Sequence, residues 1–151
     1  MNKFQQATSR TAIAAMLCAS SAITGAQDHI GNLSTNPFGP DSTSNSFGAG
    51  NPLDAISINN PFGTYGNPYS NRSATNPFAT DAPKLYDSRG SYRGRLSTNP
   101  YDPESVSNPF GRYGSEFSPD SISNPFGAGN PFSADSPNNP FGQGLKIIVD
   151  Q

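Results

Sequence analysis

Apolar residues in most of this chain stand alone, separated by Asn, Ser, Pro and Gly, so no long helix or strand is predicted for these stretches. Two segments differ. Residues 84–96 alternate apolar and polar positions around a D-S-R-G turn, which predicts a β-hairpin. Residues 145–149 form a β-branched apolar run, which could add an edge strand to that hairpin or serve as a docking tail for the sheet edge of a partner.

The isolated aromatics belong to a short repeated motif. Pro suits the second position of a β-turn, Asn suits the first through its side-chain hydrogen bond to the backbone, and a following Gly tolerates the last. The motif is therefore predicted to be a turn. Asn-Pro-Phe begins at Asn36, Asn60, Asn76, Asn108, Asn124, Asn130 and Asn139, Asn-Pro-Tyr at Asn67 and Asn99, and degenerate copies at Asn45 and Asn51.

A longer period lies over this motif, because L-S-T-N-P at residues 33–37 recurs at 96–100, an offset of about 63 residues. Within each half the units are about 15 residues long. We expect a mostly irregular or disordered, turn-rich repeat array, since such units offer little apolar surface to offset the entropy of ordering. The alternative is a thin solenoid of stacked turns with the aromatics pointing inward.

The N-terminus has the features of a secretory signal peptide: residues 1–10 carry Lys3 and Arg10 without an acid, and an uncharged small-residue run follows. We expect cleavage after Ala26, although retention as an anchor is the alternative. Cleavage would remove Cys18, the single cysteine, and leave no stable membrane span. The expected location is outside the cytoplasm, in the periplasm, at the cell surface or secreted.

These patterns divide the chain into five segments. They are a signal peptide (1–26), a first repeat half (27–81), a hairpin connector (82–96), a second repeat half (97–144) and a C-terminal strand or tail (145–151).

The charge pattern argues against a nucleic-acid partner, because the net charge is only -2 and 13% of residues are charged. Arg89, Arg93 and Arg95 form a single basic cluster, interpreted as the solvated surface of the hairpin.

No catalytic constellation is apparent in the sequence. His29 has no nucleophile or carboxylate beside it and is interpreted as a frayed N-terminal residue. No cofactor or metal site is predicted; the acids that recur at related unit positions, a weak calcium contact at most, are interpreted as solvated turn carboxylates. Those acids are Asp41, Glu104, Asp120 and Asp135. We therefore expect the protein not to be an enzyme.

Two resemblances bear on partners. The Asn-Pro-Phe tripeptide resembles the peptide ligand of eukaryotic EH domains, in which an Asn-Pro turn presents the Phe to an apolar pocket. Residues 85–132 are similar to small exported bacterial proteins of unknown function with NPF, NPY and SPDSI-type repeats, which supports a bacterial source.

The expected function is that of an exported structural or multivalent interaction protein of the bacterial periplasm or cell surface. The alternative is a translocated effector or adaptor that binds EH domains of a host. The candidate partner-binding residues are the repeat aromatics Phe38, Phe62, Phe78, Phe110, Phe126, Phe132, Phe141, Tyr69 and Tyr101.

Overall fold

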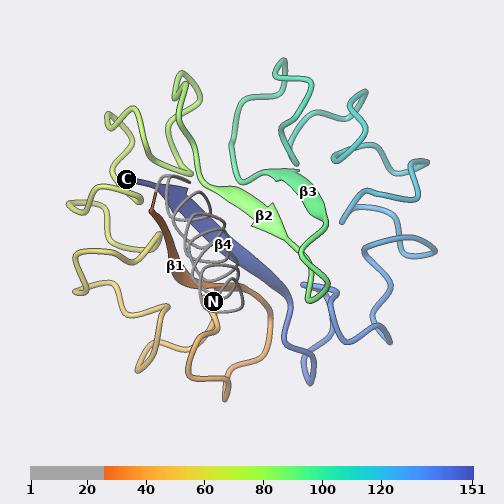
Figure 1. Cartoon of the computed structure of the whole chain (residues 1–151), viewed down its shortest axis with the longest axis horizontal. Coiled ribbons are helices and arrows are strands. Elements are labelled where there is room, and N and C mark those ends of the chain that lie inside the picture. Colours follow the sequence, from red (N-terminus) through yellow and green to blue (C-terminus); the bar gives the residue numbers. More distant parts are fainter. Residues whose placement is uncertain (1–25) are drawn as a thin grey trace, which may run out of the picture.

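A computed structural model describes residues 26–151, so the predicted signal peptide lies outside the described residues except for Ala26. This part of the chain contains no helix and four strands, β1 (Gln27–Leu33), β2 (Lys84–Tyr86), β3 (Tyr92–Arg95) and β4 (Leu145–Asp150). The strands form one antiparallel sheet in the order β1-β4-β2-β3 (Figure 1). Long turn segments occupy residues 34–83 and 96–144.

The predicted hairpin is confirmed: β2 and β3 pair antiparallel, with Tyr86 opposite Tyr92. The predicted C-terminal strand is also confirmed, but its expected place at the sheet edge is wrong. β4 lies between β1 and β2 because residues 27–33, which the sequence reasoning assigned to the first repeat half, form an additional strand. That segment, QDHIGNL, has no alternating apolar pattern, so its extended conformation depends on pairing with β4 at the far end of the chain.

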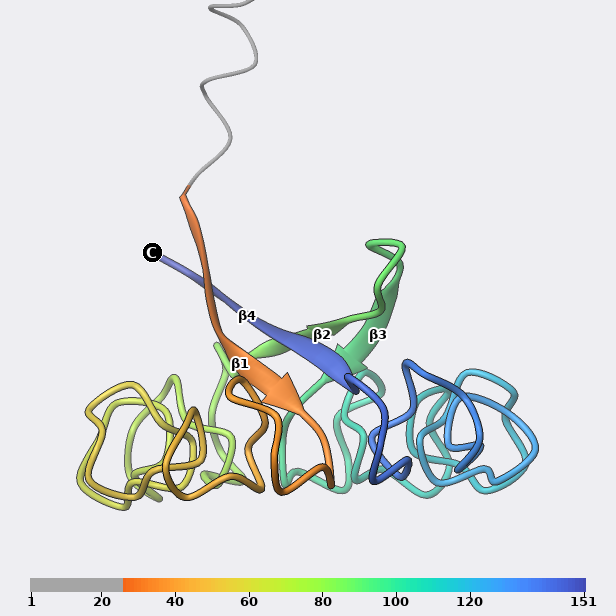
Figure 2. The ribbon, with the colours of Figure 1, turned by 90° about the horizontal axis from the view of Figure 1, so that it is seen from below.

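The buried core is small and lies on one face of the sheet. Successive residues of β4 alternate between buried and more exposed, as expected for a strand with one buried face. The core comprises Ile30, Leu85, Leu145, Ile147 and Val149, and partly buried residues of the turn segments, such as Ile58, Val106 and Ile122, pack against it. Figure 2 accordingly shows the sheet lying across one side of the turn segments.

The turn segments are irregular, as expected, yet they follow a local rule. Along most of both segments a backbone N–H donates to the carbonyl three residues earlier, and these turns follow one another in steps of three or four residues. In the second segment, for example, the amides of Ser105, Asn108 and Gly111 donate in succession to Asp102, Ser105 and Asn108. The chain thus satisfies its backbone through consecutive turns instead of strands.

Polar side chains fill the interior of the turn segments. Ser57, Ser73, Ser105, Ser121 and Ser136 are fully buried. The hydroxyls of the first three donate to carbonyls eight residues earlier, at 2.9–3.1 Å. Because the repeat aromatics are exposed, the expected inward orientation of these side chains is wrong. Small hydroxyl side chains can bond the closely spaced backbone, whereas a phenyl ring there would leave those carbonyls unsatisfied.

In the view of Figure 1 the turn segments run around the sheet, and they meet each other at two joins. At one join the Thr35 amide donates to Pro137 O at 2.9 Å. At the other, the Leu96 amide donates to Pro83 O at 2.8 Å and the Thr98 hydroxyl to Thr75 O at 3.1 Å. We call the closed arrangement of residues 34–83 and 96–144 the turn ring.

Candidate functional site: an aromatic rim

The Asn of each repeat holds the turn that presents the aromatic. In the copy at residues 124–126, Asn124 Oδ1 accepts a hydrogen bond from the Phe126 amide at 2.9 Å, and Asn124 Nδ2 donates to Ser118 O at 3.0 Å. The Gly127 amide closes the turn by donating to Asn124 O at 3.1 Å. The Asn side chain therefore lies toward the ring interior, and the aromatic side chain points outward.

All nine predicted aromatics share this local geometry. In every Asn-Pro-Phe and Asn-Pro-Tyr copy the amide of the aromatic donates to the Asn Oδ1, at 2.9–3.0 Å. The sequence prediction of an Asn side-chain hydrogen bond to the backbone is confirmed. Because this bond is common to all nine copies, each copy presents its aromatic ring on a similarly held turn.

Three further apolar side chains, Phe47, Leu53 and Phe117, have the same exposed position but were missed as candidates. The amides of Phe47 and Leu53 donate to the Oδ1 atoms of Asn45 and Asn51, and the Phe117 amide donates to the Ser115 hydroxyl, at 2.9–3.3 Å. An acceptor side chain two residues earlier is thus enough, and the proline is dispensable. The sequence spacing would have revealed these three residues. Within each half, the intervals between successive exposed apolar residues of this kind alternate between nine residues and six or seven residues.

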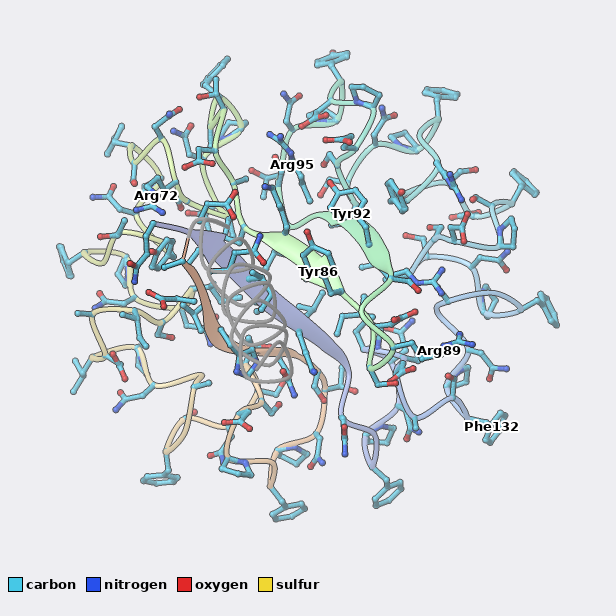
Figure 3. All side chains as sticks on the ribbon, in the orientation of Figure 1. Arg72, Tyr86, Arg89, Tyr92, Arg95 and Phe132 are labelled. Atoms are coloured by element: carbon cyan, nitrogen blue, oxygen red, sulfur yellow. The ribbon has the colours of Figure 1, made fainter. Side chains whose placement is uncertain are left out.

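Together these side chains form the aromatic rim, which lies along the outer edge of the turn ring. Their exposed fractions run from 84% to 100%, and Figure 3 shows the rings pointing away from the centre, with Phe132 labelled. The rim comprises Phe38, Phe47, Leu53, Phe62, Tyr69, Phe78, Tyr101, Phe110, Phe117, Phe126, Phe132 and Phe141. The structure therefore brings the predicted residues onto the outer edge of the turn ring and does not gather them into one common pocket.

Open grooves separate neighbouring rim residues. One is lined by Phe132, Phe141, Pro131, Pro140 and Asn139. A second lies between Phe110 and Phe117 and is lined in part by Pro109, Val106 and Glu116. Phenyl and pyrrolidine rings line both grooves, and the amides of the phenylalanines are bonded within their turns. Contacts here would therefore be made mainly by apolar surface.

The basic cluster of the hairpin is more structured than expected. Arg93 pairs with Asp87 and with Asp120, both at 2.9 Å, and Asp120 also pairs with Arg112. Burial alone would raise the pKa of Asp87, but hydrogen bonds from the Ser91 amide and Arg93 outweigh it and hold that pKa below its ordinary value. The interpretation as a solvated surface is therefore wrong for Arg93, whereas Arg89 is exposed.

A tyrosine cluster lies beside this network. Tyr92 contacts Tyr86 and Tyr113 edge-on, with ring centroids 5.6 and 5.5 Å apart. Burial, assisted by the nearby Glu104 carboxylate, raises the pKa of Tyr92 to about 12. This cluster joins the hairpin to the second turn segment.

The other titratable candidates are dispersed. His29 is not a frayed residue, because it lies in β1 opposite Ile148, and its Nε2 lies 2.7 Å from Asn32 Oδ1. Glu104 pairs with Arg95, and Asp120 belongs to the arginine network. Within residues 26–151, no three His, Cys, Asp or Glu side chains gather where they could hold a metal ion.

Two further findings concern membrane-spanning helices and similarity to known proteins. In the described part of the chain, no helix has the length and apolar character needed to cross a membrane. No protein-family model, curated protein or solved structure matches the chain.

Proposed function

We propose that this protein is an exported, non-catalytic interaction protein of the bacterial periplasm or cell surface, which binds its partner through many weak copies of one contact. The observation that carries this proposal is the aromatic rim, whose side chains are at least 84% exposed on turns that repeat the same hydrogen bonds. Apolar side chains exposed to this extent mark interaction sites when they are gathered on one surface.

The energetics favour a multivalent contact. Burying one phenyl side chain in a partner contributes about 1.5–3 kcal/mol, which is too little for stable binding by a single rim residue. Because each turn is already hydrogen-bonded, little backbone entropy is lost when its aromatic binds. Several residues engaged together would gain affinity through a high effective concentration.

The rim geometry also limits the partner. The side chains point away from one another around the ring, so a flat surface reaches only adjacent rim residues at one time (Figure 3). A partner that engages more of the rim must be present in several copies or must surround it. Repeated components of a cell envelope meet the first condition, and the signal-like N-terminal sequence supports that location.

The test is co-sedimentation of the purified chain with cell envelopes of its source bacterium. Variants would carry Phe→Ser at two, four or all nine rim phenylalanines, and the control would replace the exposed Arg89 and Lys146, which line neither groove, with Ser. We expect retention to fall more steeply than in proportion to the number of rings removed, and the control to bind like the native chain. Equal retention of the nine-fold variant and the native chain would refute a role for the rim, and fractionation that finds the native chain in the cytoplasm would refute the location.

A second candidate function is supported by the turn geometry itself. EH domains take Asn-Pro-Phe in a turn with an accessible Phe, and the seven copies have that turn and that exposure. A translocated effector would use them on host EH domains. The test is binding to a purified EH domain: Phe→Ala in all seven copies should abolish binding, whereas Tyr→Ala at Tyr69 and Tyr101 should not, and binding that persists without the seven phenylalanines would exclude this candidate.

A further inference from the structure

The two halves of the chain depend on each other for every strand pair. The first half contains β1, the first turn segment and β2, and the second half contains β3, the second turn segment and β4. The three pairs, β1·β4, β2·β4 and β2·β3, all join one half to the other. Neither half can therefore form any part of the sheet by itself.

The sheet contacts obey an internal two-fold relation that exchanges the halves. Leu85 pairs with Ile147 at the centre, and the relation exchanges these two residues. The strand order β1-β4-β2-β3 reads the same after β1 is exchanged with β3 and β2 with β4. The other pairs that β2 makes obey the same relation: Lys84↔Ile148 matches Tyr86↔Lys146, Lys84↔Arg95 matches Lys146↔Asn32, and Tyr86↔Tyr92 matches Ile148↔His29.

Irregular features obey it as well. Each outer pair carries a register shift, one between His29 and Gly31 and the other between Lys84 and Tyr86, opposite β3. Gly31 and Gly94 occupy equivalent places, with φ values of 139° and 94°. A Cβ at Gly94 would lie 2.7 Å from the Tyr113 side chain, and one at Gly31 would lie 2.8 Å from the Ala49 Cβ. The equivalence thus extends from the strands to the turn segments beneath them.

Both joins of the turn ring connect opposite halves too. The start of the first segment is bonded to the end of the second, and the start of the second is bonded to the end of the first. The covalent connection between the halves is one short loop, Asp87–Ser91, of which residues 88–91 are exposed. The chain is therefore built like a symmetric dimer whose two subunits have been fused through this loop.

We infer that the surface between the halves fits a second copy of this chain, and that two molecules can exchange halves reciprocally. The first half of one molecule then pairs with the second half of the other, with the same strand pairs and joins. Since these contacts are the same in both forms, the loop decides between them. In the native chain the loop favours the closed monomer, because the Asp87 amide donates to Ser91 O, the Gly90 amide donates to Asp87 O, and Gly90 takes a φ of 81° that suits glycine.

Shortening the loop tests this inference. Deletion of residues 88–90 from the full chain prevents β2 from turning back into β3, so we expect a dimer of twice the native mass by light scattering with a native far-ultraviolet circular dichroism spectrum. The matched control replaces the same three residues with Gly-Ser-Gly-Ser-Gly and should stay monomeric. A folded monomer from the deletion variant would overturn the inference.

A disulfide distinguishes exchange of halves from a side-by-side dimer. Asn32 of β1 and Lys146 of β4 are cross-strand neighbours, and replacing both with Cys in a Cys18→Ser background places a bond across the halves. In the shortened-loop variant, oxidation should link two chains on a non-reducing gel, whereas in the native-loop variant it should link residues of one chain. Intrachain bonds alone in the shortened dimer would overturn the inference.

A cleavable loop gives an independent readout if the deletion variant does not fold. A protease site inserted in the loop allows the folded full chain to be cut, and light and isotopically heavy samples can then be unfolded together and refolded. We expect native mass spectrometry to find paired halves in all four isotopic combinations, each at the summed mass of one first half and one second half with the corresponding labels. Halves that separate in native buffer and remain folded individually would refute the mutual dependence on which the exchange is based.

Discussion

Replacement of Asn124 with Ala should destabilise the fold by removing the two hydrogen bonds that hold one rim turn. The substitution removes the acceptor for the Phe126 amide and the donor to Ser118 O, which lie 2.9 and 3.0 Å from the Asn124 side chain. A hydrogen bond of this kind contributes about 0.5–1.5 kcal/mol net. Both partners lie in partly buried surroundings where water can replace some of the loss, so the expected cost is about 2 kcal/mol.

Two matched variants divide that cost between the bonds. Asn124→Ser should keep an acceptor, because Ser121 and Ser118 accept from amides two residues later at equivalent steps, and should cost about 1 kcal/mol through loss of the donor. Asn130→Ala should also cost about 1 kcal/mol, because among residues 26–151 the Asn130 side chain makes only the bond to the Phe132 amide.

The assay is urea denaturation followed by the near-ultraviolet circular dichroism of the tyrosines, since the chain has no tryptophan. For a chain of this size, 2 kcal/mol corresponds to a fall in Tm of roughly 6–10 °C. Equal stability of Asn124→Ala and the native chain would refute the view that Asn side chains hold the turns. Equal losses for Asn124→Ala and Asn130→Ala would refute a contribution from the Nδ2 donor.

Three further predictions concern the core, the rim and pH. Leu85→Ala removes a fully buried side chain from the core and should lower the free energy of unfolding, measured by urea denaturation, by about 2–5 kcal/mol. Phe126→Ser at the exposed rim should change it by less than about 0.5 kcal/mol. Similar losses in the two variants would contradict the assignment of Leu85 to the core and of Phe126 to the exposed rim. In a spectrophotometric titration one tyrosine should ionise near pH 12, and Tyr92→Phe should remove that step. Because the pKa of Tyr92 is higher in the folded than in the unfolded state, the free energy of unfolding should fall as pH rises from about 10 to 12. A titration without a step near pH 12 would contradict the burial of Tyr92. The pKa of Asp87 is lowered in the folded state from its ordinary value of 3.8. Its contribution to stability is therefore fully present above that value and is lost as pH falls from there through the lowered pKa. Asp87→Asn should flatten this acid limb of the stability curve, and an unchanged limb would exclude Asp87 as its source.

The strands show what local pattern can and cannot predict. The hairpin and the C-terminal strand follow from alternation and from a β-branched run, which are properties of the segments themselves. β1 does not, because its sequence QDHIGNL has no alternation of apolar and polar residues, and its extended conformation is set by pairing with β4. The position of β4 in the sheet could not be predicted without that strand.

The rim shows a different limit. Turn chemistry correctly predicts the hydrogen bond of the Asn side chain to the backbone. The usual rule that aromatic side chains face the interior is wrong for the rim residues, which are exposed. The decisive contacts are the hydroxyls of buried residues such as Ser73 and Ser105, which bond carbonyls of the preceding turns. These contacts join neighbouring passes of the chain, and spacing within a single motif does not reveal them.

Residue-resolved amide hydrogen exchange of the full chain tests the central claim most directly, because the rim requires an ordered turn ring. We expect slowed exchange at turn amides that donate three residues back, such as those of Asn108, Ser121 and Ser136, and not only at the amides of the sheet. Exchange of these turn amides at the rate of an unstructured peptide, with protection confined to the strands, would contradict the account.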